Sequence, residues 1–389
     1  MKDFRMMGGI RSSTVLPCLL TLAFAASAFA GISCDEPANR YRNRDIFGSL
    51  KETPNIPYGS NKNPLHNNAT ETLSMDIFQP ANDTCTKRPL IIFMYGGGFQ
   101  GGQRQDETGD CRQFAKRGFV AATIDYRKGN PGPYTTHNFC TPAFMSTQDT
   151  RAAIRFFRKN AAQYGIDTSL IFVGGCSSGA YAAMHTAFLD QASEIPSYID
   201  ASALDGGIEG NSGNPGFSSK FAGVLSLSGG LFDTTWINKG DIPVAAVQCL
   251  QDGIESPDSL HDGTGGKAFV KNFDATRFTP RMNHMGIQIL VKSYPQDCHC
   301  YHQVDGTGLD LTIDFLAKSA YAIMTARAAT SLVGIALSQG DLRLLPPQDG
   351  IYDLRGERFQ ESDPAIKANP ASAFHPGLYF RKKSVSGER

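Results

Sequence analysis

Apolar runs and helical patterns alternate along most of the chain. Residues 90–94 form a continuous apolar run that ends in glycines, which is typical of a strand buried on both faces. Residues 72–78 alternate between apolar and polar, as a half-buried strand does, and residues 149–164 carry apolar side chains close to the helical period. By these criteria we predict strands at 72–78, 90–94, 119–124, 170–173, 222–227, 243–247 and 286–291, and helices at 149–164, 180–189 and 309–328.

Strands that alternate with helices predict an α/β fold, with a mostly parallel sheet and helices on both faces. Residues 31–70 are polar and rich in turn residues, so we expect them to be irregular. Short strand-like segments recur near the end of the chain, around 351–356 and 376–380. Because ligands bind at the carboxyl ends of parallel strands, we expect the chemistry directly after the strands.

The first thirty residues have the pattern of a secretory signal peptide. Three basic side chains precede an apolar run over 14–30, which ends in Ala-Phe-Ala. We therefore expect residues 1–30 to be a signal peptide and the protein to be secreted; a buried N-terminal helix and a lipid anchor at Cys34 are the alternatives. No other stretch reaches about 18 apolar residues, so we expect no membrane span.

Charge and cysteine content narrow the class of protein further. The 389 residues hold 37 Lys and Arg against 37 Asp and Glu, and this balance argues against a nucleic-acid partner. Apolar residues make up 41% and charged residues 19%, so the chain is not of the disordered type. Of nine cysteines, Cys18 falls in the signal peptide. The remaining eight, in an exported chain, favour disulfides, for which 105 pairings exist.

The sequence Gly175-Cys176-Ser177-Ser178-Gly179 fits G-x-S-x-G between a predicted strand and a predicted helix. A sharp strand-to-helix turn needs glycine on both sides, and it lifts the serine hydroxyl above the sheet. Ser177 is therefore the candidate nucleophile. The alternative is a glycine-rich turn that packs a helix close to a strand.

A serine nucleophile also needs donors that receive the oxyanion. The segment Tyr95-Gly96-Gly97-Gly98 follows the buried strand at 90–94. Backbone N–H groups of Gly97 and Gly98, together with that of Ser178, can converge on one oxygen. We expect these three to form an oxyanion hole.

With these motifs, residues 70–325 resemble an α/β-hydrolase of the esterase/lipase type. The resemblance implies an α/β-hydrolase fold and the chain order Ser, Asp, His. Tyr95 stands where that family has His.

The resemblance also directs the choice of base and acid. His299 and His302 follow the last predicted strand, and the Tyr294-Pro295 segment before His299 resembles the family's ending, so His299 is the expected base. The strand at 243–247 leads to Asp252, about where the family places its acid. Its distance of 47 positions from His299 is long for the fold, so other carboxylates remain candidates: Glu255, Asp258 and Asp262.

Cys176 precedes Ser177 and Cys300 follows His299. This pair resembles the Cys-Ser and His-Cys dipeptides of the tannase and fungal-type feruloyl esterase group, and the resemblance implies a Cys176–Cys300 disulfide. Cys249 and Cys298 are then plausible partners beside the acid and the base. The pairs Cys111–Cys140 and Cys34–Cys85 follow by elimination. A metal site is the alternative for this region, built from Cys298, His299, Cys300 and His302; the ligands are bunched too closely for usual zinc spacing.

The C-terminal segments around 351–356 and 376–379 resemble the sorting domain of type IX secretion. The resemblance implies export with that secretion machinery as a partner, and a structural β-hairpin is the alternative. We thus expect a signal peptide at 1–30, a catalytic domain at 31–335 and a sorting-like tail at 336–389.

These features together predict a secreted serine carboxylic-ester hydrolase that works through an acyl-enzyme on Ser177. No metal and no organic cofactor are expected. By family analogy, the substrates are small-molecule esters or acetyl and feruloyl esters of plant polysaccharide. The glycine-rich segment 206–219, with Phe99, Gln100 and Trp236, is expected to line the substrate pocket. The alternatives are a serine peptidase on the same fold and a catalytically inactive binding protein.

Overall fold

The computed structural model describes residues 34, 40–201, 204–261, 268–303, 306–338, 351–352 and 380–381. The expected signal peptide lies outside the described residues. The chain divides into two units, Met1–Leu332 and Val333–Arg389. In the second unit the structure describes the end of helix α6 (Gly306–Ser338) and two short strands, β12 (Ile351–Tyr352) and β13 (Phe380–Arg381), which pair antiparallel.

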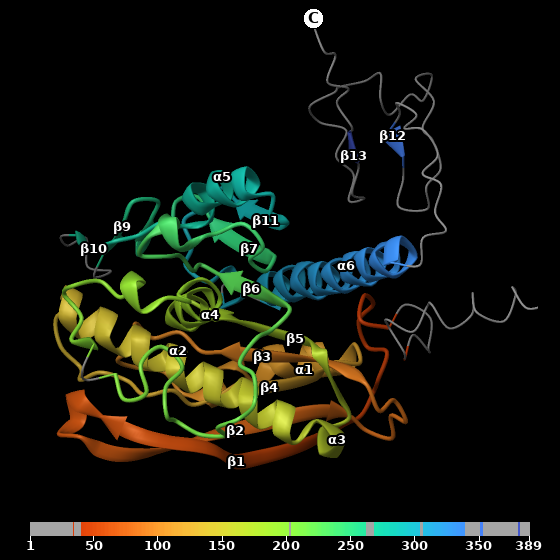
Figure 1. The fold of residues 1–389 in the computed structure, drawn as a ribbon, viewed down its shortest axis with the longest axis horizontal. Coiled ribbons are helices and arrows are strands. Elements are labelled where there is room, and N and C mark those ends of the chain that lie inside the picture. The colour runs from red at the N-terminus through yellow and green to blue at the C-terminus, as the bar shows by residue number, and fades with distance from the viewer. Residues whose placement is uncertain are drawn as a thin grey trace, which may run out of the picture. The chain divides into compact units, whose positions relative to one another are not determined.

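The first unit is built on an eight-stranded sheet in the order β1-β2-β4-β3-β5-β6-β7-β11 (Figure 1). The strands β1 and β2 pair antiparallel, as do β2 and β4, and every later neighbour is parallel. The strands are β1 (Leu50–Asn63), β2 (Ala69–Pro80), β3 (Arg88–Met94), β4 (Val120–Ile124), β5 (Ile166–Cys176), β6 (Gly223–Leu227), β7 (Val244–Cys249) and β11 (Ile289–Tyr294). Each of the predicted strands overlaps one of them.

The expectation of an irregular segment over residues 31–70 is wrong, because β1 occupies 14 of these residues. This strand lies at the sheet edge, where a proline costs no ladder hydrogen bond. Register shifts at Thr53/Ile56 and Pro57/Gly59 break its alternation. Few of its side chains are buried, so the strand carries little of the apolar pattern by which strands are recognised in a sequence.

Helices cover both faces of the sheet and divide the core into two clusters. Helices α2 (Thr136–Lys159) and α4 (Ser178–Phe188) pack on one face. Helices α1 (Thr108–Lys116) and α6 pack on the other. Helix α2 begins well before the predicted residue 149, with Thr135 accepting a hydrogen bond from the backbone of Asn138 as its N-cap.

Smaller elements complete the unit between and beside these layers. A three-stranded antiparallel sheet follows β7, and helix α5 (Ala275–Met285) precedes β11. The remaining elements are β8 (Glu255–Ser256), β9 (Ser259–His261), β10 (Ala268–Lys271), α3 (Ala161–Tyr164), η1 (Pro64–His66), η2 (Arg104–Glu107), η3 (Ala192–Glu194), η5 (Thr234–Trp236) and η6 (Tyr301–Gln303).

Among the helices that the structure describes, none combines the length and the apolar character that crossing a bilayer requires.

Candidate active site

The candidate nucleophile sits in a sharp turn between β5 and α4. Ser177 has φ 51° and ψ −122°, a conformation that side chains rarely adopt. A Cβ on Gly175 or Gly179 would run into the carbonyl oxygen of Met94 at the end of the neighbouring strand. Glycine on both sides therefore lets the serine backbone pass this close to β3.

His299 contacts both of its expected partners. Its Nε2 lies 2.8 Å from Ser177 Oγ, and its Nδ1 lies 2.7 Å from Asp252 Oδ2. The Asp252 side chain is fully buried, whereas the imidazole keeps 21% of its surface exposed. A buried carboxylate thus faces one ring nitrogen, and the other nitrogen faces the hydroxyl, the arrangement that a serine nucleophile needs.

The loop after β7 fixes the Asp252 carboxylate. The backbone N–H groups of Ile254 and Glu255 donate to Asp252 Oδ1 at 3.0 and 2.9 Å, which leaves Oδ2 for His299. The strands β7 and β11 end together in parallel register, with Tyr294 opposite Cys249. The loops that carry Asp252 and His299 therefore start side by side.

The other candidate acids lie elsewhere. Asp258 is exposed and pairs with Arg277 at 2.7 Å. Glu255 is buried and contacts Tyr181 and Asn272. Asp262 falls outside the described residues. Of the described candidates, Asp252 is the one hydrogen-bonded to His299.

The contacts around Glu255 leave one hydrogen for two acceptors. Tyr181 Oη has one hydrogen, yet it lies 2.7 Å from Glu255 Oε1 and 2.6 Å from Asn272 Oδ1. The Asn272 amide nitrogen donates to Ser256 O at 3.0 Å, which fixes its oxygen toward Tyr181. A proton on Glu255 would satisfy both contacts, because tyrosine could then donate to Asn272 and accept from the carboxyl.

Electrostatics at Glu255 agree with this assignment. Burial and, after it, the nearby charge of Asp252 raise the pKa of the Glu255 carboxyl to about 8. A neutral Glu255 places no second negative charge beside Asp252 and His299. Nothing in the sequence signals this difference between two carboxyl groups three residues apart.

The glycine loop after β3 lies against the nucleophile. Met94 pairs with Gly175, so the loop begins beside the turn that carries Ser177. A Cβ on Gly96 would lie 3.1 Å from the Ser177 Cβ. Gly97 and Gly98 have φ values of 120° and 61°, which favour glycine.

Three backbone donors are free near Ser177. Within the described part of the chain, the N–H groups of Gly97 and Gly98 make no hydrogen bond to the backbone or to a side chain. The N–H of Ser178 is the first of α4, where the helix itself provides no acceptor. The geometry therefore leaves all three expected oxyanion-hole donors available.

An aromatic pair braces this loop, which the sequence analysis did not foresee. Tyr95 stacks on Tyr126 with ring centroids 4.4 Å apart. Tyr126 Oη donates to Tyr95 O at 2.9 Å and lies 3.2 Å from Ser178 Oγ. Burial raises the pKa of Tyr126, so its hydroxyl keeps the proton that it donates. Tyr126 comes two residues after the end of β4, and that position near a strand end was the available signal.

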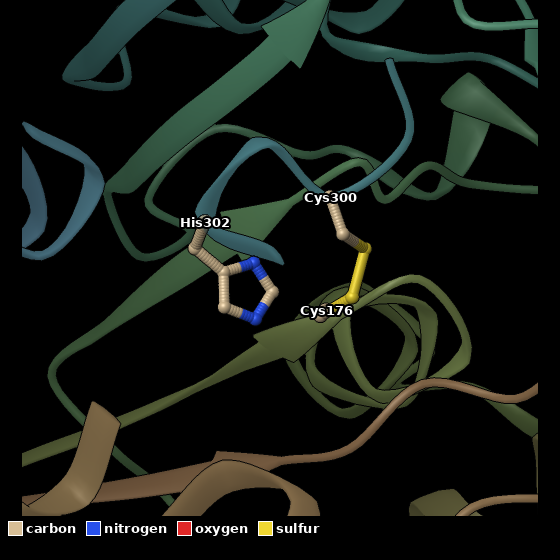
Figure 2. Close-up of side chains that lie close together, drawn as sticks. All are labelled: Cys176, Cys300 and His302. Atoms are coloured by element: carbon tan, nitrogen blue, oxygen red, sulfur yellow. A yellow bond between two sulfur atoms is a disulfide. The ribbon is translucent and has the colours of Figure 1, made fainter. Parts of the chain in front are cut away.

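Disulfides join the loops around the candidate triad. Cys176 and Cys300 form one, with Cα atoms 5.8 Å apart (Figure 2), and Cys249 and Cys298 form another, at 5.6 Å. A third links Cys34 and Cys85. The first two tie the His299 loop to the ends of β5 and β7.

The expected Cys111–Cys140 disulfide is absent: both cysteines are buried and free. Cys111 lies in α1 within the core cluster on one face of the sheet, and Cys140 lies in α2 within the cluster on the other face. The sheet separates them, so they cannot bond. The assignment of this pair by elimination failed because an even number of cysteines does not mean that every cysteine forms a disulfide.

The alternative metal site of Cys298, His299, Cys300 and His302 does not form. Both cysteines are consumed in disulfides, and His299 faces Ser177 and Asp252. His302 Nε2 lies 3.5 Å from Glu107 Oε2 in η2 and 3.8 Å from Asp110 Oδ2 in α1.

Parts of the expected pocket lining belong to the core instead. Phe99 and Trp236 are buried, the former against Phe139 and the latter against His185. The described segment 206–219 is anchored on α2. Three side chains of that helix hold its carbonyl oxygens, namely Gln148, Arg151 and Arg155.

The fold is that of the α/β-hydrolases. The chain superposes on the structure of esterase 2 of Thermogutta terrifontis, phosphoramylated by tabun, with a TM-score of 0.51 and 19% identity, covering 65% of this chain and 90% of that one. The apo form of the same esterase gives the same values. At this level of identity, the likeness concerns the fold.

Sequence comparison points in the same direction. The model of the BD-FAE family matches residues 75–229, which include the glycine loop and Ser177. Juvenile hormone esterase of Heliothis virescens is 29% identical over 111 residues, which are 28% of this chain and 20% of that protein. Acetylcholinesterase of Gallus gallus is 31% identical over 121 residues, 30% of this chain and 16% of that protein.

A further relative is the neuroligin-like protein glit-1 of Caenorhabditis elegans, 31% identical over 112 residues, 28% of this chain and 15% of that protein. The chain thus spans between about a seventh and a fifth of the length of these three curated relatives.

Proposed function

We propose that the chain is a serine hydrolase of carboxylic esters. The observation that carries this proposal is the continuous contact from Asp252 through His299 to Ser177, at 2.7 and 2.8 Å. Such a contact activates a hydroxyl because the imidazole can take its proton while the buried carboxylate stabilises the imidazolium. The similarity to named esterases supports the choice of ester bonds.

In the first half of the reaction, Ser177 Oγ attacks the ester carbonyl carbon and His299 Nε2 takes the hydroxyl proton. The carbonyl oxygen becomes an oxyanion, which the N–H groups of Gly97, Gly98 and Ser178 receive. The intermediate then collapses, the bond to the alcohol oxygen breaks, and His299 returns the proton to the leaving alcohol. An acyl group remains on Ser177.

In the second half, water replaces the alcohol. His299 takes a proton from water, the hydroxide adds to the acyl carbon, and the carboxylic acid leaves as Ser177 recovers its proton. Asp252 stays ionised throughout and keeps the imidazole oriented, since two backbone N–H groups hold its other oxygen. The residues of this chain suffice for both halves.

The resemblance to tannases and feruloyl esterases directs the substrate proposal. The Cys176–Cys300 disulfide flanks Ser177 and His299 in this protein, as the dipeptides of that group led us to expect. We therefore propose acetyl or feruloyl esters, free or on plant polysaccharide, as substrates. Three disulfides support a secreted protein, since such bonds persist in oxidising compartments. Export through type IX secretion and its machinery remains a proposal from the C-terminal resemblance.

A substrate panel tests the function. The purified chain is given 4-nitrophenyl acetate, methyl ferulate, acetylated xylan and a peptide 4-nitroanilide, beside a Ser177→Ala variant. We expect hydrolysis of at least one ester, little or none of the anilide, and loss of turnover in the variant. Preference for the anilide would favour a peptidase. A folded chain that cleaves none of them would favour the binding protein.

A further inference from the structure

A second cluster of potential ligands lies next to the loop that carries His299. It consists of Glu107 at the end of η2, Asp110 in α1 and His302 in η6, and one ligand atom from each lies within 4.8 Å of the others. His302 Nε2 is 3.5 Å from Glu107 Oε2 and 3.8 Å from Asp110 Oδ2. None of these side chains contacts Ser177 in the contacts described above.

The cluster is buried, yet its polar atoms lack hydrogen-bond partners. The Glu107 side chain has no exposed surface, and those of Asp110 and His302 keep only 4% and 3%. In the described part of the chain, neither oxygen of Glu107 has a partner in strict hydrogen-bond geometry, and the same holds for Asp110 Oδ1 and His302 Nδ1. The two carboxyl groups lie close enough to interact with each other, and His302 lies close to the backbone of Cys300. Burying polar groups without partners costs free energy. A ligand at the centre of the cluster would offset that cost.

The distances fit a shared cation better than hydrogen bonds. At 3.5 and 3.8 Å, the contacts from His302 Nε2 are too long for hydrogen bonds. Two ligands that each lie about 2.0–2.2 Å from one tetrahedral zinc ion are about 3.4 Å apart. A small inward movement of each side chain would therefore complete the coordination.

The charges also favour a cation. Two carboxyl groups lie in the cluster, and among the described residues no Lys or Arg forms an ion pair with either. One divalent cation at the centre would neutralise both as carboxylates.

We propose that Glu107, Asp110 and His302 form a binding site for Zn²⁺. One imidazole nitrogen and two carboxylate oxygens are a ligand set that suits zinc, with the fourth position left for water. Calcium takes six to eight oxygen ligands and does not suit such a set. The sulfur atoms of Cys176 and Cys300 lie near the same histidine (Figure 2) but are bonded to each other, so they are not ligands.

The ion would provide a third link between the loop that carries His299 and the rest of the fold. Disulfides already tie residues 298–300 to β5 and β7. Zinc would link His302, three residues after His299, to α1 on the other side of the loop. Its role is structural, and the site goes beyond the proposed function.

The test measures zinc on the full, untagged chain after treatment with a chelator. We expect titration with ZnSO₄ to restore one zinc per chain, measured by mass spectrometry of the metal and by calorimetry, and to raise Tm. CaCl₂ should do neither. Zinc uptake and Tm should respond in the same way in the Ser177→Ala chain, which separates this proposal from the proposed function.

A near-isosteric variant provides the matched comparison. Glu107→Gln combined with Asp110→Asn should lose the stoichiometric zinc and the zinc-dependent rise in Tm, while Asp106→Asn, an exposed neighbour on η2, should keep both. If the wild-type chain takes up no zinc and the amide variant is as stable as the wild type, the cluster shares protons instead and the proposal is wrong. Wild-type zinc binding in the amide variant would place the ion elsewhere and overturn it too.

Discussion

At the residue scale, the site depends on a few side chains whose surroundings set their charge. Asp252 and Glu255 lie on the same loop, but backbone N–H groups hold the first as an acceptor, whereas burial against Tyr181 raises the pKa of the second. Motifs and their order in the chain led to Ser177, His299 and Asp252 from the sequence. The sequence separation from His299 could not exclude Glu255, because the path of the loop decides which carboxyl group contacts the histidine.

Replacing Asp252 by Asn should lower kcat by about 10⁴-fold, because the amide no longer stabilises the imidazolium and favours the wrong tautomer. Glu255→Gln is the matched comparison, since a neutral amide replaces a neutral acid. Steady-state kinetics on one activated ester measures both. A mild effect of Asp252→Asn together with a severe effect of Glu255→Gln would transfer the acid role to Glu255.

Glu255 should also make stability depend on pH. Its pKa is about 8 in the folded chain against an ordinary value of 4.5, so between these values the folded state holds a proton that the unfolded chain has released. The free energy of unfolding therefore falls as pH rises through this window, by up to about 1.4 kcal/mol per pH unit from this group. Glu255→Gln should abolish that part of the slope.

Urea unfolding at pH 5, 6, 7 and 8 measures the difference between the wild type and Glu255→Gln. Glu52→Gln is the control, because the pKa of Glu52 is lowered and the group stays ionised in both states over this range. A constant difference between wild type and Glu255→Gln would mean that Glu255 is not protonated in the folded chain.

At the element scale, strands buried on both faces could be predicted and the edge strand could not. The apolar runs of β3 and β5 stand out because neither face meets water. In β1, the bulges and the exposed face remove that pattern. Helix α2 begins earlier than predicted because buried polar side chains before residue 149, such as Thr147 and Gln148, interrupt the apolar period.

One of these buried polar contacts fastens α2 to the end of β4. Arg127 and Asp149 pair at 2.9 Å with 1% and 0% of their side chains exposed. Arg127→Met should lower the free energy of unfolding by about 3–5 kcal/mol, because it leaves Asp149 buried without its cation. Denaturant unfolding gives the value.

The exposed pair Arg277–Asp258 is the control for that variant, with 51% and 69% of the side chains exposed. Arg277→Met should change the free energy of unfolding by less than about 1 kcal/mol. Equal effects at the two sites would contradict the role assigned to the buried pair.

At the scale of the whole molecule, the candidate triad is assembled from loops far apart in the chain. Ser177 follows β5, Asp252 follows β7 and His299 follows β11, and the parallel sheet brings these strand ends to one edge. The alternation of strands and helices predicts a parallel sheet whose site lies at the carboxyl ends of the strands. Neither the strand order nor the face that each helix covers can be read from the alternation. The separation of Cys111 from Cys140 by the sheet could therefore not be predicted from the sequence.

Loss of the Cys176–Cys300 disulfide should lower kcat/KM as well as the free energy of unfolding. It closes a loop of 124 residues, worth about 5 kcal/mol in the simplest chain-entropy estimate. Replacing both cysteines by Ala should also lower kcat/KM in the folded variant, because His299 loses its tie to the nucleophile loop. Kinetics and unfolding on one preparation measure both effects.

The pair Cys34–Cys85, away from the triad, serves as the control. Its replacement by Ala should lower the free energy of unfolding and leave kcat/KM near the wild-type value. A folded Cys176→Ala/Cys300→Ala variant with full activity would show that the disulfide does not position His299.

The most direct test of the account is covalent labelling of Ser177. A fluorophosphonate should lose fluoride to the serine oxygen and leave one phosphonyl group per chain, which intact-mass measurement and peptide mapping would locate on Ser177. His299→Ala should slow the labelling strongly, since the base is gone. Hydrolysis of an ester by a chain that takes no label, or takes it on another residue, would contradict the acyl-enzyme mechanism.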